Sequence, residues 1–274
     1  MRGRGLVKRL AMWPLSVVSE NLRAEALELM SSTSTAEAQV PGASLTFFAP
    51  TPLLRQRAET LLTKEPDMIA WLQQLPPDAV LWDIGANVGV FSLYAAATRK
   101  CSVLSFEPSA ANFYVLTRNI QLNHLEARIS AYCVALSGET KLGVLNLDSA
   151  ALGGSMTQFG QAGEISRYST GGHALSHGML GITIDEFVKR FAPPFPTHVK
   201  MDVDGLELPI LQGAASTLRD SRITSAMVEL SLSNPAERDR AIAILAAAGL
   251  HLVSQGESQG NAGESAANHL FVRR

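Results

Sequence analysis

The stretch Trp82-Asp83-Ile84-Gly85-Ala86-Asn87-Val88-Gly89 decides the fold expected for this chain. It connects a short apolar run over 80–84 to a segment of helical character over 89–98. Glycines in such a turn let the backbone reverse tightly and let a ligand approach the main chain. A strand, a glycine-rich turn and a helix in this order are typical of a unit that binds a nucleoside-containing cofactor.

The same alternation of apolar runs and helical segments continues along the chain. A helix is expected over 110–123, because Phe113, Leu116 and Ile120 recur on one face. Strands that alternate with helices of this length form βαβ units and a mostly parallel sheet with helices on both faces. We therefore predict a Rossmann-like α/β fold, with its further strands at 102–106, 129–136, 198–201, 226–230, 250–254 and 270–272.

Several helix ends are marked by side chains suited to capping. The strings Thr183-Ile-Asp-Glu186 and Asp204-Gly-Leu-Glu207 are capping boxes, and Asn234 stands before a proline at a first helical position. Gly249 is expected to end the helix that begins there.

Residues 1–75 are expected to form an N-terminal extension, partly helical, that serves as a lid or substrate-side segment. Residues 1–45 read as irregular or partly helical, and 51–75 as two helices separated at Pro66. Residues 76–274 form the main domain, with a glycine-rich insertion at 148–181 that is expected to be a loop. The basic N-terminus loosely resembles a secretory signal, but Pro14 interrupts it and no clear cleavage site follows, so a basic tail that folds back or frays is favoured.

Composition narrows the partners and the compartment. The 23 basic and 25 acidic residues nearly balance, which gives no electrostatic reason to expect nucleic acid. The two cysteines, Cys101 and Cys133, are interpreted as reduced core thiols, which suits a cytoplasmic protein. No apolar run reaches the roughly 18 residues of a membrane span, so no transmembrane segment is expected.

The type of cofactor is indicated by the turn and by an acidic residue beyond it. Glu107 ends the second strand, 22 positions after Gly85, where a carboxylate accepts hydrogen bonds from ribose hydroxyls. The dinucleotide fingerprint would need glycine at positions 87 and 90, which are Asn87 and Val90 here. S-adenosylmethionine has no phosphate and tolerates a side chain there. The alternative is a structural turn that binds no ligand.

The chain resembles the FkbM family of methyltransferases. The matching strings are Asp83-Ile-Gly-Ala-Asn-Val-Gly89, Phe106-Glu107-Pro108 with Asn112 after it, Arg118-Asn-Ile-Gln-Leu-Asn123, Val134-Ala-Leu-Ser137, and Val199-Lys-Met-Asp-Val-Asp-Gly-Leu-Glu207 followed by Leu211-Gln-Gly213 and Glu229. Residues 57–71 also resemble the lead-in segment of one subgroup, and the similarity spans roughly 47–255.

This resemblance implies a class I methyltransferase sheet of seven strands, the last antiparallel, that binds S-adenosylmethionine. It implies methylation of an oxygen, typically a hydroxyl of a sugar, glycolipid or natural product. Asp204 stands where many members have glutamate, which keeps the charge and shortens the reach. The cofactor-binding residues implied are Asp83, Gly85, Asn87, Gly89, Glu107 and Asn112.

Asp202 and Glu229 are the candidate catalytic residues, because both end strands at the edge of the sheet where ligands bind. Asp202 is a general base for the acceptor hydroxyl, or it joins Glu229 in holding a divalent metal; base chemistry without a metal is slightly favoured. A simple pairing of Asp202 with Lys200 is not expected, because Lys200 lies deeper in the strand.

Three functions follow from these residues. The leading one is an S-adenosylmethionine-dependent O-methyltransferase with a small-molecule or glycan acceptor. The alternatives are a nicotinamide-dependent oxidoreductase on a related fold and a non-catalytic cofactor-binding module. His173 and His177, in the glycine-rich insertion, are interpreted as solvated side chains rather than as a catalytic base.

Overall fold

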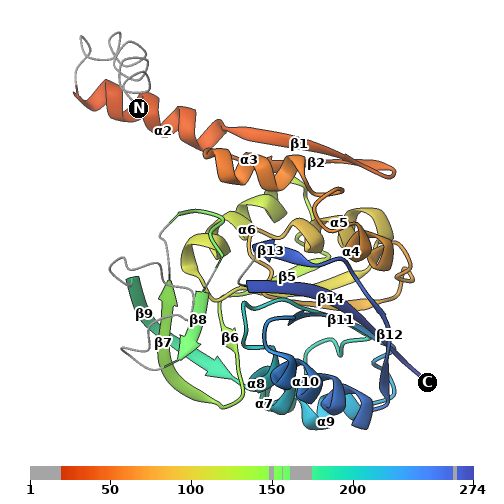
Figure 1. Cartoon of the computed structure of the whole chain (residues 1–274). Coiled ribbons are helices and arrows are strands. Elements are labelled where there is room, and N and C mark those ends of the chain that lie inside the picture. Colours follow the sequence, from red (N-terminus) through yellow and green to blue (C-terminus); the bar gives the residue numbers. More distant parts are fainter. Residues whose placement is uncertain (1–19, 148–150, 156, 161–174, 262–263) are drawn as a thin grey trace.

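The central sheet of the computed structural model contains seven strands in a continuous hydrogen-bonded order (Figure 1). The structure describes residues 20–147, 151–155, 157–160, 175–261 and 264–274. Only β14 runs antiparallel to its neighbours β11 and β12, and the short strand β13 (Gln259–Asn261) pairs with β14. The order is β12 (Leu250–Gln255), β14 (Glu264–Arg273), β11 (Ser225–Ser231), β10 (His198–Met201), β3 (Val80–Ile84), β4 (Ser102–Phe106) and β5 (Ile129–Tyr132).

Helices cover both faces of this sheet, which confirms the predicted Rossmann-like α/β fold. Because strand side chains alternate between faces, Leu81 packs into one buried cluster and its neighbour Trp82 into the other. One face holds α4 (Pro66–Leu72), α5 (Val90–Arg99) and α6 (Ala110–Leu122); the other holds α7 (Ile184–Phe191), α8 (Glu207–Gln212), α9 (Ala215–Arg219) and α10 (Pro235–Ala247).

Residues 20–48 are more regular than their sequence suggested. They form α2 (Glu20–Thr33) and an antiparallel hairpin of β1 (Thr35–Val40) and β2 (Ala43–Phe48), so the expectation of an irregular or partly helical segment was wrong for the hairpin. Strand β1 alternates exposed polar and buried apolar residues, but two of its three buried residues are alanines, which are poor strand formers. Two helices follow as expected, α3 (Pro52–Glu59) and α4.

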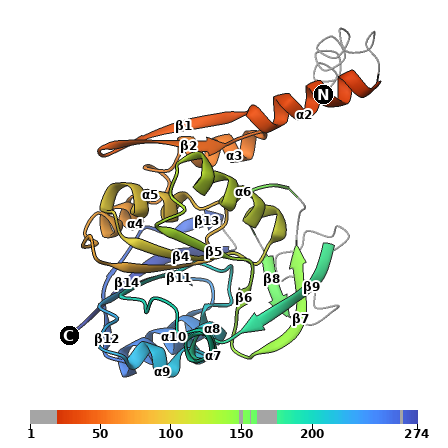
Figure 2. The same cartoon turned by 180° about the vertical axis from the view of Figure 1, so that it is seen from behind.

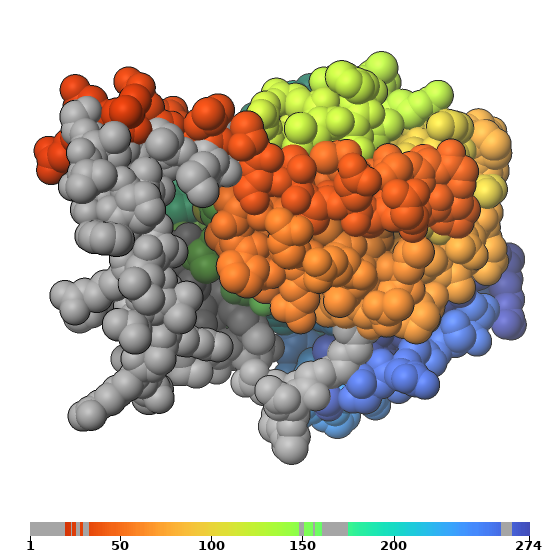
Figure 3. All heavy atoms as spheres, turned by 90° about the horizontal axis from the view of Figure 1, so that it is seen from above, coloured from red at the N-terminus to blue at the C-terminus, as the bar shows by residue number. Residues whose placement is uncertain are grey.

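The hairpin is attached to the main domain by Asn119 of α6 and by Asn123, the residue that follows this helix. Asn119 Oδ1 accepts from the Phe48 amide at 2.7 Å, and Asn123 accepts from and donates to the backbone of Thr46 at 2.9 and 2.7 Å. Figure 3 shows the hairpin lying between α6 and the α3–α4 segment. The N-terminal segment therefore shares one hydrophobic core with α5 and α6.

A second, four-stranded sheet lies beside the central one (Figure 2). Parts of the 148–181 insertion belong to it, so the expectation of a loop was wrong for residues 157–160 and 175–181. Both strands find a partner in β7, which precedes the insertion, and long-range pairing outweighs their glycine content. His173 lies outside the described residues. The order is β6 (Ala135–Leu136), β9 (Leu175–Ile182), β7 (Lys141–Leu147) and β8 (Thr157–Gly160).

Two of the three predicted caps are confirmed. Thr183 Oγ1 accepts from the Glu186 amide, and Asn234 Oδ1 accepts from the Glu237 amide. The box at 204–207 was wrong: α8 begins only at Glu207, and Asp204 has a left-handed backbone with φ of 54°.

Other expectations are also resolved. Gly249, with φ of 86°, follows the end of α10 as predicted. Cys101 is buried, but Cys133 is exposed, contrary to the core position expected for it. Among the described residues, no helix is both long and apolar enough to cross a membrane.

Candidate active site

One cavity opens where β3, β4, β10 and β11 end. It encloses about 1240 Å³, including the space open to solvent at its mouth. The strand order reverses between β3 and β10, and ligands of open parallel sheets bind in the crevice at such a reversal. The predicted residues Gly85, Asn87, Glu107, Asp202 and Glu229 all line this cavity.

The glycine turn after β3 is shaped by its neighbours. The amides of Gly85 and Ala86 both donate to Phe106 O at 3.0 Å, which ties the turn to the end of β4. Gly85 has φ of +78°, and a Cβ built on it would lie 1.8 Å from Asp202 O. A Cβ on Gly89 would lie 2.4 Å from Leu116 Cδ1. Glycine is required at 85 because the loop after β10 crosses the turn there, a reason that the sequence did not reveal.

Glu107 is a buried carboxylate that faces the cavity from the end of β4. Its Oε2 accepts from the Asn87 amide at 2.7 Å and its Oε1 from the Ser109 amide at 2.9 Å. Burial raises the pKa of Glu107 to about 7, although these two hydrogen bonds act in the opposite direction. The Asn112 side chain also interacts with this carboxylate, and the acceptor positions that the protein leaves open are available to a ligand donor.

Asn87 and Asn112 both contact a short turn of the insertion. The side-chain nitrogens of both residues donate to Gly154 O at 2.9 Å. Asn112 is buried and is not among the residues that line the cavity, whereas Asn87 lines it, and its buried Oδ1 has no protein hydrogen-bond partner. Asn87 Oδ1 is therefore left to accept a hydrogen bond from a ligand, whereas Asn112 holds the turn in place behind the cavity surface.

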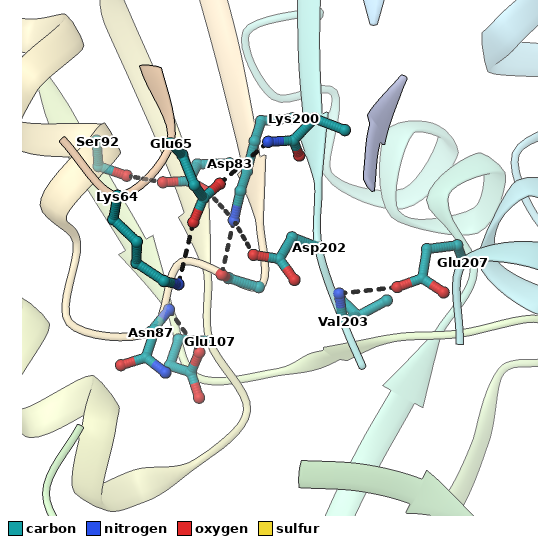
Figure 4. A network of polar contacts seen from close by, with 12 residues as sticks. Lys64, Glu65, Asp83, Asn87, Ser92, Glu107, Lys200, Asp202, Val203 and Glu207 are labelled. Carbon is teal, nitrogen blue, oxygen red and sulfur yellow. Dashed lines mark hydrogen bonds and ion pairs between the residues drawn. The ribbon is translucent and has the colours of Figure 1, made fainter. Parts of the chain in front are cut away.

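A buried lysine that sequence reasoning did not select joins the strand ends. The ammonium of Lys200 lies 3.2 Å from Asp83 Oδ1 and 3.6 Å from Asp202 Oδ2, and it donates to Gly85 O at 3.0 Å (Figure 4). The expectation that Lys200 and Asp202 would not pair was therefore wrong. Strand alternation does put residues 200 and 202 on the same side, and a long lysine side chain covers the distance between them.

The charge of Lys200 follows from this setting. Burial alone lowers the pKa of the ammonium, but the carboxylates of Asp83 and Asp202 outweigh burial and raise it, so Lys200 is a permanent cation. Asp83 is buried, and its Oδ2 also accepts from the Ser92 hydroxyl at 2.5 Å. Asp83 is not among the residues that line the cavity, so it reaches the glycine turn through Lys200.

Several acidic side chains interact with Asp202 or Glu229, and Asp202 itself lies beside the glycine turn. Asp202 raises the pKa of Glu229, and burial and the nearby Glu65 raise it further, because two carboxylates this close cannot both ionise freely. Glu65 is buried and accepts from Asn268 Nδ2 at 3.2 Å. Glu207 accepts from the Val203 and Gly205 amides at 3.1 and 3.2 Å, and burial raises its pKa to about 7. The site thus combines the buried Lys200 ammonium and the half-buried Arg57 guanidinium with several carboxylates.

The seven strands in continuous order, one of them antiparallel, and the acid-lined cavity at the glycine turn define a Rossmann-like α/β domain with a ligand site at its strand ends. The profile of the Methyltransferase FkbM domain matches residues 83–252, well over half of the chain. The chain therefore belongs to the FkbM methyltransferase family.

Several known proteins are similar to this chain. Hexuronic acid methyltransferase AglP of Haloferax volcanii is 29% identical over 159 residues, which are 58% of this chain and 59% of that protein. Methyltransferase sdnD of Sordaria araneosa is 36% identical over 67 residues, 24% of this chain and 26% of that protein. The matches thus span about three fifths of the first relative and a quarter of the second.

Solved structures are more distant. The precorrin-6y C5,15-methyltransferase from Geobacter metallireducens aligns with a TM-score of 0.46 and 13% identity, over 79% of this chain and 93% of that one. The M. jannaschii TYW2 in complex with AdoMet aligns with a TM-score of 0.44 and 11% identity, over 88% and 87%.

Proposed function

We propose that this protein is an S-adenosylmethionine-dependent O-methyltransferase that acts on a hydroxyl of a sugar, glycolipid or natural product. The observation that carries the proposal is that carboxylates from neighbouring strand ends line one cavity. Glu107 faces it beside the glycine turn, and the Asp202–Glu229 carboxylates face it from the next strands. The hexuronic acid methyltransferase similar to this chain favours a saccharide acceptor.

The residues present fit the proposed cofactor. Glu107 offers its open acceptor positions to ribose hydroxyls, and the buried Asn87 Oδ1 offers an acceptor that no protein donor uses. The side chains of Asn87 and Val90 would obstruct the close approach of a pyrophosphate to this turn. The acidic wall of Asp202, Glu229 and Glu65 suits the positive charge of a sulfonium.

When bound, S-adenosylmethionine supplies an electrophilic methyl group; the protein supplies alignment and a proton acceptor. Asp202 is the proposed acceptor of the hydroxyl proton, and Lys200 holds its carboxylate at a fixed place beside the glycine turn. Glu229 and Asp202 share their negative charge, because Asp202 raises the pKa of Glu229. Among the described residues, no three or more His, Cys, Asp or Glu side chains are grouped to hold a metal ion.

A thermal-shift titration tests the cofactor, with S-adenosylmethionine, its demethylated product and NAD as separate ligands. A ligand that binds only the folded state at one hundred times its Kd stabilises it by about 2.7 kcal/mol. We expect the first two ligands to raise the melting temperature and NAD to leave it unchanged. Stabilisation by NAD alone would favour an oxidoreductase instead.

Product analysis with methyl-labelled cofactor tests the acceptor class. The panel contains neutral sugars, uronic acids, lipid-linked glycans and hydroxylated natural products. Label recovered as a methyl ether on a hydroxyl supports the proposal. Label recovered on nitrogen or carbon, or cofactor binding without transfer to any acceptor, contradicts it.

A further inference from the structure

A short turn of the insertion, residues 151–155, is held by three side chains from separate elements. Arg57 Nε of α3 donates to Gly153 O at 2.8 Å, and the Gly153 amide donates to Asn112 Oδ1 of α6 at 2.9 Å. Asn87, in the glycine turn, and Asn112 both donate to Gly154 O at 2.9 Å. These contacts join positions that are 41 to 96 residues apart in sequence.

The position of this turn determines one wall of the cofactor cavity. Ser155, which ends the turn, and Thr157, which begins β8, both line the cavity. The next residue, Gln158, donates through Nε2 to Asp204 O at 3.2 Å, so the same strand also contacts the loop after β10. A shift of the turn would therefore move side chains at the cavity surface.

The turn is also linked directly to the proposed ribose site. Asn87, which holds Gly154 through its side chain, donates its own amide to Glu107 Oε2 at 2.7 Å. Arg57 itself lines the cavity, and its helix α3 lies before the residues matched by the family profile, 83–252. A segment outside the matched region thus completes a wall beside Glu107.

We propose that Arg57 is a positioning residue for the cofactor cavity: with Asn87 and Asn112 it holds turn 151–155 as a wall that slows the escape of the cofactor. This inference rests on the proposed function for the identity of the cofactor. The turn then serves to retain the cofactor.

The experiment compares Arg57→Met with a matched control on the same helix, Arg55→Met. Arg55 is exposed and also donates to a backbone carbonyl, that of Thr35 at 3.2 Å, but it does not line the cavity. Hydrogen bonds from charged donors are strong enough that losing one typically weakens binding about tenfold or more. We expect Arg57→Met to raise the Kd and the dissociation rate of S-adenosylmethionine at least tenfold, a larger change than that in kcat at saturating cofactor. Arg55→Met should leave the Kd, the dissociation rate and kcat unchanged.

Hydrogen exchange at the Gly153 amide gives a readout that a general loss of stability would not reproduce. We expect cofactor to slow this exchange in the wild type and in Arg55→Met, and to have little effect in Arg57→Met. Gly153→Ala is a second variant that keeps Arg57 and the rest of the α3 sequence. Its Cβ would lie 2.8 Å from Leu54 Cδ2, at a φ of +80°, so it should displace the turn and copy the effect.

The outcomes separate the two proposals. If wild-type protein does not bind S-adenosylmethionine, the proposed function fails. If wild type binds it and both Arg57→Met and Gly153→Ala bind with unchanged Kd and dissociation rate, the inference is overturned. A fall in kcat with unchanged Kd would also overturn it, because the turn would then serve the acceptor.

Discussion

At the scale of single residues, Glu107 makes cofactor binding sensitive to pH. Burial raises its pKa to about 7, so half of the molecules carry a neutral carboxyl near neutrality. Ribose hydroxyls need the ionised form as a double acceptor, so affinity should increase as the pH rises through 7. If only the ionised form binds, Kd at pH 6 exceeds Kd at pH 8 by about tenfold.

Calorimetry in two buffers of different ionisation enthalpy checks this expectation, since binding below pH 7 should release a proton. Glu107→Gln is the control: it should bind more weakly and lose most of the pH dependence. Constant wild-type affinity between pH 6 and 8, with no proton release, would remove Glu107 from the ribose site.

Asp202 is the residue on which the proposed chemistry depends. Asp202→Asn preserves shape but neither accepts a proton usefully nor carries charge, so turnover should fall about 10²–10⁴-fold. Cofactor affinity should remain near that of the wild type, because Asp202 raises the pKa of Glu229, and Glu229 can carry the negative charge once residue 202 is neutral. Single-turnover kinetics together with calorimetry measures both quantities, and near-normal turnover would disprove a catalytic role.

A chelator distinguishes base chemistry from metal chemistry at the same carboxylates. We expect wild-type activity to survive exhaustive treatment with a chelator, because Lys200 supplies the positive charge next to Asp202. Activity that disappears and then returns with magnesium would show that Asp202 and Glu229 hold a metal ion.

At the scale of elements, the glycine turn after β3 and the loop after β10 fit together through Gly85. Gly85→Ala places a Cβ 1.8 Å from Asp202 O, and Gly42→Ala is a close control, because Gly42 has φ of +77° with nothing within 4 Å. Both substitutions incur backbone strain of roughly 1–2 kcal/mol. Urea unfolding should show that Gly42→Ala lowers the free energy of unfolding by this amount and that Gly85→Ala lowers it clearly more. Gly85→Ala should also abolish cofactor binding.

At the scale of the whole molecule, the N-terminal segment is part of the domain core. Leu45 and Phe47 of the hairpin and Trp71 of α4 belong to the same buried cluster as Leu93 and Leu116 of the main domain. A fragment of residues 76–274 would expose that cluster, so it should lack a cooperative unfolding transition and bind a hydrophobic dye. The fragment 34–274 keeps the hairpin and the two helices after it, so it should retain a cooperative unfolding transition. Equal midpoints for both fragments would show that 76–274 is independent.

The sequence by itself determined the fold class, because strand and helix periodicities and the glycine turn are local signals. It also determined that Glu107, Asp202 and Glu229 would share one edge, since the ends of parallel strands meet there. It missed the hairpin, whose alanine-rich strand carries a weak local signal, and the strands of the insertion, which depend on pairing with β7.

Only the tertiary structure decided which side chains meet. Lys200 joins Asp83, Gly85 O and Asp202, Arg57 reaches a carbonyl 96 positions away, and Gly85 faces the backbone of Asp202. No characteristic residue spacing in the sequence indicates these contacts, because each depends on how neighbouring strands and loops are placed. A sequence pattern reports the periodicity of one element, whereas charge pairing and close packing depend on distances between elements.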